Sequence, residues 1–175
     1  KILNKTQRER KDLLSQFLDI DITANHVVVS CGGKHAIMNV CLALLDAGDE
    51  VIIPSPYWVS YPEQVKLCGA NPVFVNCNED NQFCLTAADF EAAITEKTKL
   101  LILNSPSNPT GMLYTKDNLE ALLTIAKKHN IYVLSDEIYA QLIYDGLSHQ
   151  SIASLDGLDE HVILVSGVAK SYAMT

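Results

Sequence analysis

Short apolar runs alternate along the chain with longer segments that have helical periodicity. The runs are apolar almost throughout, and the segments between them carry apolar residues at three- and four-residue spacing. The runs expected to form strands are HVVVS (26–30), EVIIP (50–54), PVFVN (72–76), KLLILN (99–104), IYVLS (131–135) and VILVS (162–166). The segments expected to form helices are 5–18, 34–47, 58–68, 86–95 and 116–129. Because continuous apolar runs fit strands that are buried on both faces, the pattern predicts an α/β fold: a mostly parallel sheet with helices on both faces.

The size and charge of the chain restrict what it can bind. Its 175 residues suffice for one packed domain, and its net charge of -8 argues against nucleic acid or an anionic membrane as a partner. No apolar stretch approaches the ~20 residues that a membrane helix needs, and no signal-peptide pattern opens the chain. The five cysteines are scattered and form no CxxC pair, so no disulfide framework and no metal site is predicted. We therefore expect a cytoplasmic protein.

A pair of glycines, Gly32 and Gly33, precedes the expected helix that starts at residue 34. In a parallel sheet, ligands bind beyond the carboxyl ends of the strands, and such a turn lies in that position. Glycines allow close backbone approach, and the free N–H groups at a helix start attract a phosphate. The turn has neither the GxGxxG fingerprint of dinucleotide-binding domains nor the GxxxxGK[ST] nucleotide loop, so an ordinary tight turn is the alternative interpretation.

Three more strand ends carry polar groups. The loop at 105–111 contains two prolines, so it is stiff and holds Asn108 in a fixed position, although it can equally be a simple turn. Asp136 follows a buried run, with Tyr139 three residues later; a helix cap or an ion pair is the alternative role for this carboxylate. Lys170 follows the last apolar run, among small residues. If the sheet is parallel, these side chains meet at one edge.

This combination of groups matches the chemical demands of pyridoxal phosphate. Lysine in a confined site can act as a nucleophile toward a carbonyl carbon. The cofactor needs such an amine, an anchor for its phosphate, and an acidic partner that keeps its ring nitrogen protonated. Lys170, the turn at Gly33 and Asp136 would meet these three needs.

Five motifs resemble, in this order, the class I/II aminotransferases of pyridoxal-phosphate fold type I. They are GGKHA (32–36), GDEVIIPSPYWVSYPE (48–63), NSPSNPTG (104–111), SDEIY (135–139) and GVAKSYAMT (167–175). The similarity runs from about residue 5 to the last residue and is strongest to the bacterial-type aspartate aminotransferase branch. The resemblance implies a transaminase that uses pyridoxal phosphate.

The resemblance also implies roles for individual residues. Lys170 would be the catalytic lysine, which forms an imine with the cofactor and moves a proton. Asp136 would pair with the ring nitrogen, and Tyr139 and Asn108 would share the ring oxygen. Trp58 would stack on the ring, and the turn of Gly33 and Lys34 would bind the phosphate through backbone N–H groups. The resemblance further places Trp58 and Asn108 beside the substrate.

The chain departs from the family pattern in two places. Many relatives carry serine three residues before the lysine to bind phosphate, whereas this chain has Gly167, as some relatives do. Relatives continue beyond the end of this sequence with a GWRxG segment and a C-terminal small domain, and they begin with an N-terminal arm. We therefore expect residues 1–175 to be an incomplete large cofactor-binding domain, a fragment that is inactive alone and belongs to a homodimer when full length.

The favoured activity is transfer of an amino group from aspartate to a 2-oxo acid such as 2-oxoglutarate, because SPYWVSYPE is most like the aspartate branch. An aromatic, alanine or prephenate-type aminotransferase is the alternative within the family. A dehydrogenase would share the strand and helix pattern but should show GxGxxG after the first strand, and a non-catalytic α/β domain is the third possibility.

Overall fold

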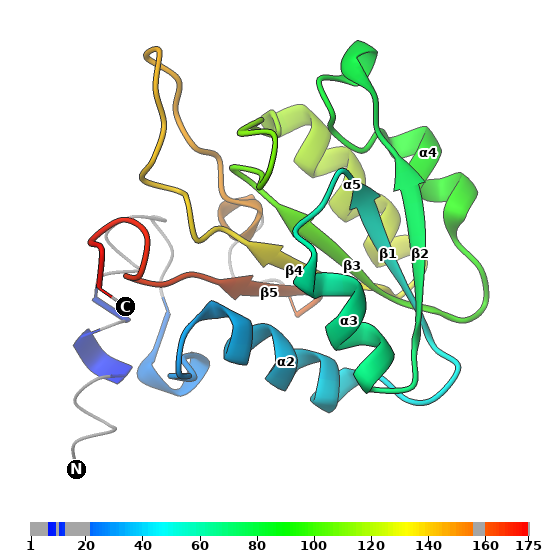
Figure 1. The fold of residues 1–175 in the computed structure, drawn as a ribbon, viewed down its shortest axis with the longest axis horizontal. Helices are drawn as coiled ribbons and strands as arrows, with labels where there is room; N and C mark the ends of the chain where they lie inside the picture. The colour runs from blue at the N-terminus through cyan, green and yellow to red at the C-terminus, as the bar shows by residue number, and fades with distance from the viewer. Residues whose placement is uncertain (1–6, 10, 13–21, 156–159, 175) are drawn as a thin grey trace.

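The computed structural model describes residues 7–9, 11–12, 22–155 and 160–174. Its centre is a five-stranded, wholly parallel sheet in the order β2-β1-β3-β4-β5 (Figure 1). The strands are β1 (Glu50–Ser55), β2 (Asn71–Asn76), β3 (Thr98–Asn104), β4 (Tyr132–Asp136) and β5 (Val162–Val165). The α-helices are α2 (Gly33–Leu44), α3 (Ser60–Leu67), α4 (Ala87–Ala93) and α5 (Lys116–Lys128), and the short 3-10 helices are η1 (Ala24–His26), η2 (Glu79–Asn81) and η3 (Ile152–Ser154). The predicted α/β class is confirmed.

Helices cover both faces of the sheet (Figure 1). The core on one face is built from α2 and α3, and it includes Ile37 and Val65. The core on the other face is built from α4, α5 and η3, and it includes Phe90 and Leu122. This division explains why the strands have no polar alternation, since each face of the central strands is buried.

The alternation of side chains along β4 sends neighbouring residues to opposite faces. Leu134 packs in the core of α2 and α3, whereas Val133 packs in the core of α4 and α5. With a period of two, Asp136 shares the face of Leu134, and Ser135 and Glu137 share the face of Val133. This register determines which environment each acidic residue enters.

Two sequence expectations need correction. The run at 26–30 belongs to no strand of the described residues: Val28 is 81% exposed, while Val27 packs beside Ile22 and Ala153. Its β-branched side chains favour extended backbone, but a strand also needs a partner edge, and no described residue pairs with this run. The helix expected at 34–47 ends at Leu44.

The helix expected at 5–18 lies mostly outside the described residues. Within that range the structure describes only residues 7–9 and 11–12, and these are helical.

Within the described part of the chain, none of the helices combines the length and apolar character that a membrane span requires. Since all five strands are parallel, their carboxyl ends meet at one edge, and the loops that carry Trp58, Asn108, Tyr139 and Lys170 leave from there. Gly33 and Lys34 begin α2, which follows no strand of the described residues.

Candidate active site

Asp136 ends β4 and lies between Asn104 of β3 and Val165 of β5 in the sheet register. Its side chain is buried, with the residue 4% exposed. The Tyr61 hydroxyl donates to Oδ2 at 2.7 Å, and the backbone N–H of Ile138 donates to Oδ1 at 3.3 Å. Burial raises the pKa of the Asp136 carboxyl above its usual range, these two donors partly oppose the rise, and the neighbouring negative charge of Glu137 adds to it. A cationic N–H group placed here would therefore be strongly favoured.

Tyr61 is a site residue that the sequence analysis missed. It lies in α3, is buried, and reaches Asp136 across 75 positions of sequence. Burial and the nearby Asp136 carboxylate raise the pKa of its hydroxyl, so it remains a proton donor. The spacing of three residues from Trp58 was the available signal, since it brings the two aromatic residues together at the start of α3.

Trp58 and Lys34 form one side of the site. The Trp58 ring meets the Tyr61 ring edge to face, with centroids 5.4 Å apart and an interplanar angle of 86°. The Lys34 ammonium nitrogen lies 5.1 Å from the Trp58 ring centroid, a cation–π distance. The Gln64 side chain donates to the Lys34 carbonyl at 2.7 Å and so ties α3 to the first turn of α2. Lys34 thus places a side-chain cation beside Trp58, in addition to the backbone N–H that the sequence analysis expects to bind phosphate.

The glycine turn before α2 packs directly against the ends of β4 and β5. Gly32 has φ of +87°, which favours glycine at the helix N-cap. A Cβ placed on Gly33 would lie 3.6 Å from Ile138 Cδ1 and 3.9 Å from Val165 Cγ1. The first N–H groups of a helix have no intrahelical acceptor, so this turn presents donors at the same edge as Asp136.

The loop at 105–111 is fixed to the sheet through Asn104, a second residue that the sequence analysis left without a role. The Asn104 side chain accepts from the backbone N–H of Asn108 at 2.6 Å and donates to the carbonyl of Asp136 at 2.8 Å. The Asn108 side-chain amide makes no hydrogen bond with any described residue, so it is available to a ligand. The position of Asn108 is therefore coupled to that of Asp136.

Tyr139 and Lys170 lie on the loops that follow β4 and β5. Tyr139 is close enough to Tyr61 to contribute to the raised pKa of the Tyr61 hydroxyl. Lys170 is solvent-exposed and its side-chain amine makes no hydrogen bond or ion pair with any described residue, which corrects the expectation of an amine confined among small residues. Beside it, a Cβ on Gly167 would lie 2.8 Å from Ile138 Cδ1.

A cavity of about 20 Å³ lies behind this edge, among residues that include Tyr61, Asn104, Ser107, Asn108 and Tyr114. Its size suits about one water molecule, so it is no cofactor pocket. The groups that could hold a cofactor come from the loops and helix start at this edge of the sheet: the Trp58 ring, the Asn108 amide, the Tyr139 phenol, the Lys170 amine and the first turn of α2. This set fits a planar, phosphorylated pyridine aldehyde, whose protonated nitrogen would meet the buried carboxylate.

Comparison with known proteins gives consistent results. The family model described as aminotransferase class I and II matches residues 4–175. The chain is 49% identical over 158 residues to the aspartate aminotransferase of Bacillus subtilis, covering 90% of this chain and 40% of that protein. It therefore spans about 40% of the length of this curated relative.

Two solved structures show the same arrangement of the chain. An aspartate aminotransferase from Thermus thermophilus with maleate superposes with a TM-score of 0.93 at 40% identity, covering 98% of this chain and 44% of that one. An aromatic aminotransferase from Pyrococcus horikoshii superposes with a TM-score of 0.94 at 38% identity, covering 98% of this chain and 46% of that one. The same fold is therefore shared by solved structures that are named for different substrates, an aspartate and an aromatic aminotransferase.

Proposed function

The chain belongs to the aminotransferase class I and II family, and from this premise we propose that it carries the pyridoxal phosphate site of an amino-acid transaminase. The observation that carries the proposal is the buried Asp136 carboxylate, which has a hydroxyl and a long amide contact but no cationic partner among the described residues. A protonated pyridine nitrogen supplies the missing positive charge. When bound, the cofactor would supply an electron sink for the substrate Cα.

Each site residue then has a defined task. Lys170 would hold the cofactor covalently through its amine, with the carbonyl oxygen leaving as water, and, once the substrate amino group has displaced it, would be the base that accepts and returns the Cα proton. Asp136 holds the ring nitrogen in its protonated form, because its carboxylate accepts a charge-assisted hydrogen bond. Tyr139 and Asn108 bind the ring oxygen, and the residues that hold the ring and the phosphate are Trp58, Gly33 and Lys34. Trp58 and Asn108 also border the substrate.

Aspartate and a 2-oxo acid such as 2-oxoglutarate are the proposed substrates. Support comes from the names of relatives in Bacillus and Thermus, both aspartate aminotransferases. The second candidate is an aromatic or prephenate-type exchange, because the aromatic aminotransferase of Pyrococcus superposes equally well. An alanine aminotransferase remains the third form of the same proposal.

The proposal extends to the setting of the protein. We expect the described domain to be the cofactor-binding part of a homodimeric cytoplasmic enzyme of amino-acid metabolism. All five cysteines are free, as is usual in a reducing compartment. Because the chain spans about 40% of the length of the Bacillus subtilis relative, residues 1–175 by themselves are expected to bind cofactor weakly and to turn over negligibly. Orienting reactants is worth roughly 7–11 kcal/mol in such reactions.

Trp58 offers a direct test, because it is the sole tryptophan of the chain and lies at the site. Pyridoxal phosphate should quench its fluorescence and develop a visible absorbance band, and borohydride should then fix the cofactor on the Lys170 peptide. Lys170→Ala should remove the band and the fixed adduct while leaving the fold intact. Lys97→Ala, at an exposed lysine in the turn before β3, is the matched control. An adduct on Lys34 or Lys99 in the wild type would refute the assignment of Lys170.

The choice of substrate needs the full natural protein. Aspartate, phenylalanine, alanine and glutamate should each be mixed with the cofactor-loaded protein, and loss of the visible band should be followed in single turnover. The fastest loss with aspartate supports the first candidate, and the fastest loss with phenylalanine supports the second. No change with any of the amino acids would overturn the transaminase proposal.

A further inference from the structure

Glu137, the residue after Asp136, is a buried carboxylate that the proposed chemistry does not use. It is 3% exposed. Its Oε1 accepts from the Ser135 hydroxyl at 3.0 Å and the Ser151 hydroxyl at 2.9 Å, and its Oε2 lies 2.7 Å from His149 Nε2. Because a carboxylate only accepts, His149 donates through Nε2. We call these four residues the Glu137 cluster.

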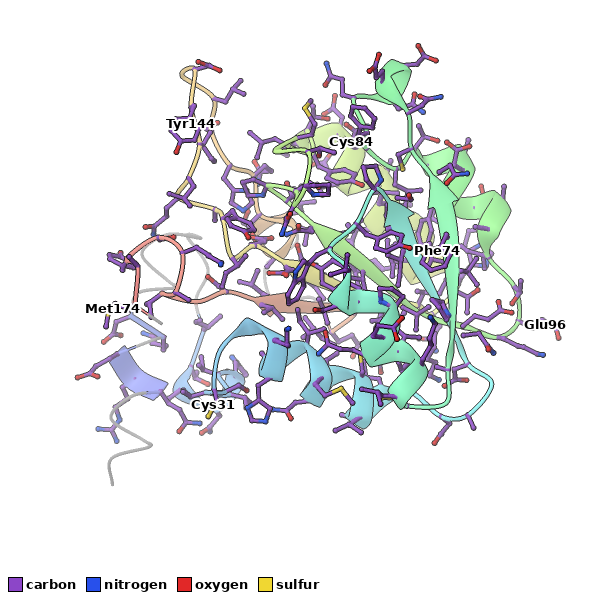
Figure 2. The ribbon with its side chains drawn as sticks, in the orientation of Figure 1. Cys31, Phe74, Cys84, Glu96, Tyr144 and Met174 are labelled. Carbon is purple, nitrogen blue, oxygen red and sulfur yellow. The ribbon has the colours of Figure 1, made fainter. Side chains whose placement is uncertain are left out.

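The cluster joins the two ends of one surface segment, residues 138–150. The segment leaves β4 directly after Glu137 and returns at His149 and Ser151, whose side chains bond the same carboxylate. Between these ends it extends away from the sheet, with Tyr144 near its far end (Figure 2), where that residue is 74% exposed. The buried Glu137 side chain therefore connects the two ends of this long, exposed segment, which we call the excursion (138–150).

Both ends of this closure are themselves anchored. The Glu137 backbone N–H donates to the Val165 carbonyl at 2.8 Å, which continues the pairing of β4 with β5. The Ser151 hydroxyl accepts from the backbone N–H of Ala153 at 3.2 Å and caps η3. The carboxylate thus bridges the end of β4 and the N-cap of η3, and the excursion begins and ends on them.

The first two residues of the excursion enter the candidate site. Ile138 Cδ1 fills the space beside Gly33 and Gly167, where added Cβ atoms would lie 3.6 Å and 2.8 Å away. Ile138 therefore lies between the phosphate-binding turn and the segment that carries Lys170. Tyr139 follows it and is proposed to bind the ring oxygen.

We propose that Glu137 is a positioning residue, which holds Ile138 and Tyr139 in the cofactor site through its bonds to His149 and Ser151. The inference rests on the proposed function. It assigns to the second acidic residue of the SDEIY motif a role distinct from that of Asp136. Glu137 touches neither cofactor nor substrate, so its effect must pass through the residues that do.

A double-mutant cycle on the full natural protein tests this coupling. Pyridoxal phosphate affinity, from a titration of the visible band, and the pH midpoint of that band are measured for Glu137→Ala, Tyr139→Phe and the double variant. Each single change should weaken binding by about tenfold and shift the midpoint by about one pH unit, the size of one charge-assisted hydrogen bond. If Glu137 acts through Tyr139, the double variant should lose little beyond the larger single loss, whereas independent effects would multiply to about a hundredfold.

Rescue and exchange measurements separate positioning from general stability. Glu137→Gln keeps an acceptor for both serine hydroxyls and should bind cofactor within about threefold of wild type. Glu120→Gln, at an exposed carboxylate of α5, is the matched control and should change nothing. Amide hydrogen exchange should rise across 138–150 in Glu137→Ala and stay unchanged in the control.

The outcomes are distinct. If Glu137→Ala does not fold, His149→Ala replaces it in the cycle, because it leaves both serine donors in place. Wild-type affinity and pH midpoint in a folded variant with faster exchange, or additive losses in the cycle, would overturn the positioning role alone. Absence of any cofactor binding by the wild type would overturn the proposed function, and this inference with it.

Discussion

Asp136 and Glu137 are consecutive buried carboxylates that the pleat of β4 turns toward opposite faces of the sheet. Asp136 faces the core of α2 and α3 and accepts one hydroxyl bond and one long amide bond. Glu137 faces the other side and accepts from two hydroxyls and an imidazole. Their exposed fractions, 4% and 3%, are nearly the same, so burial does not distinguish them.

The number and charge of the donors do distinguish them. A buried carboxylate is costly unless donors compensate it, and Glu137 has a full set of them from its own chain. Asp136 has fewer, its pKa is raised by burial, and the charge of Glu137 raises it further. A buried group that is incompletely compensated is poised to receive a ligand, whereas a compensated one stabilises the fold. In the proposed function, Asp136 would bind the cofactor and Glu137 would position the residues that follow it.

The largest effect is expected from Glu137→Ala on stability. The change leaves two hydroxyls and an imidazole buried without their acceptor, which should cost about 3 kcal/mol or more in the free energy of unfolding. In a protein of this size the melting temperature should fall by roughly 6–12 °C. Thermal unfolding without cofactor measures it, with Glu120→Ala as the control. A melting temperature like that of wild type would show that the three donors do not stabilise the fold through Glu137.

Asp136→Asn should act on binding. A neutral amide cannot replace the charge-assisted bond, worth about 1.5–3 kcal/mol, so affinity for pyridoxal phosphate should fall about tenfold to a hundredfold. The measurement is the Trp58 quenching titration. Asp117→Asn, at an exposed carboxylate in the first turn of α5, is the control. Unchanged affinity for Asp136→Asn would remove Asp136 from the binding site.

Tyr61→Phe should weaken binding less, by about threefold to tenfold, because it removes one hydroxyl bond worth about 0.5–1.5 kcal/mol. It also removes a donor that lowers the Asp136 pKa, so that pKa should rise further. The acid limb of the binding curve against pH should consequently move to higher pH. Tyr144→Phe, at an exposed tyrosine, is the control. A shift of that limb to lower pH would contradict the direction of the hydrogen bond.

The pH dependence of stability tests the same deficiency of donors without any cofactor. The folded-state pKa of Asp136 is raised. The contribution of this carboxyl to the free energy of unfolding is therefore fully present below its unfolded pKa of about 3.9, and it is lost as pH rises through the folded-state pKa. The stability of Asp136→Asn should therefore increase relative to that of wild type as pH rises. At neutral pH its melting temperature should be higher by roughly 2–4 °C, the shift that about 1 kcal/mol produces. The difference should vanish below pH 4 or so. A gain that appears only in acid would reverse the sign and refute the raised pKa.

Much of this arrangement follows from local sequence. The five strands of the sheet lie at the apolar runs that predicted them, and the position of Asp136 at the carboxyl end of β4 follows from its place after such a run. The run at 26–30 was wrongly predicted to form a strand, because strand propensity does not show whether the edge of a neighbouring strand is available for pairing. Local pattern therefore predicts elements and their ends better than it predicts pairing.

The contrast between the two carboxylates could not be predicted in this way. The side-chain partner of Asp136 lies 75 positions away in α3, and two of the three donors to Glu137, His149 and Ser151, lie 12 and 14 positions away along the chain. Strand alternation shows only that the two side chains diverge. Which donors meet them depends on how helices and loops pack, and that is settled by the tertiary structure.

The smallest effect concerns Gly167, the position at which the family resemblance implies a phosphate-binding serine in many members. Here a Cβ would lie 2.8 Å from Ile138 Cδ1, so Gly167→Ser must displace the end of that side chain. We expect a loss of about 1 kcal/mol in the free energy of unfolding and no gain in cofactor affinity. Adding Ile138→Val removes the obstructing methyl group and should recover part of the stability. The serine hydroxyl could then reach a phosphate and tighten binding a few-fold.

Urea unfolding and quenching titrations measure both quantities, with Ile138→Val alone as the control. Gly167→Ser also tests the role of Glu137, which is proposed to hold Ile138 in place. In the Glu137→Ala background Ile138 has more freedom to move, so Gly167→Ser should cost less there than in wild type, by a few tenths of a kcal/mol. An equal cost in both backgrounds would mean that Ile138 yields easily whatever Glu137 does. Glu137 would then stabilise the fold without positioning the residues that follow it.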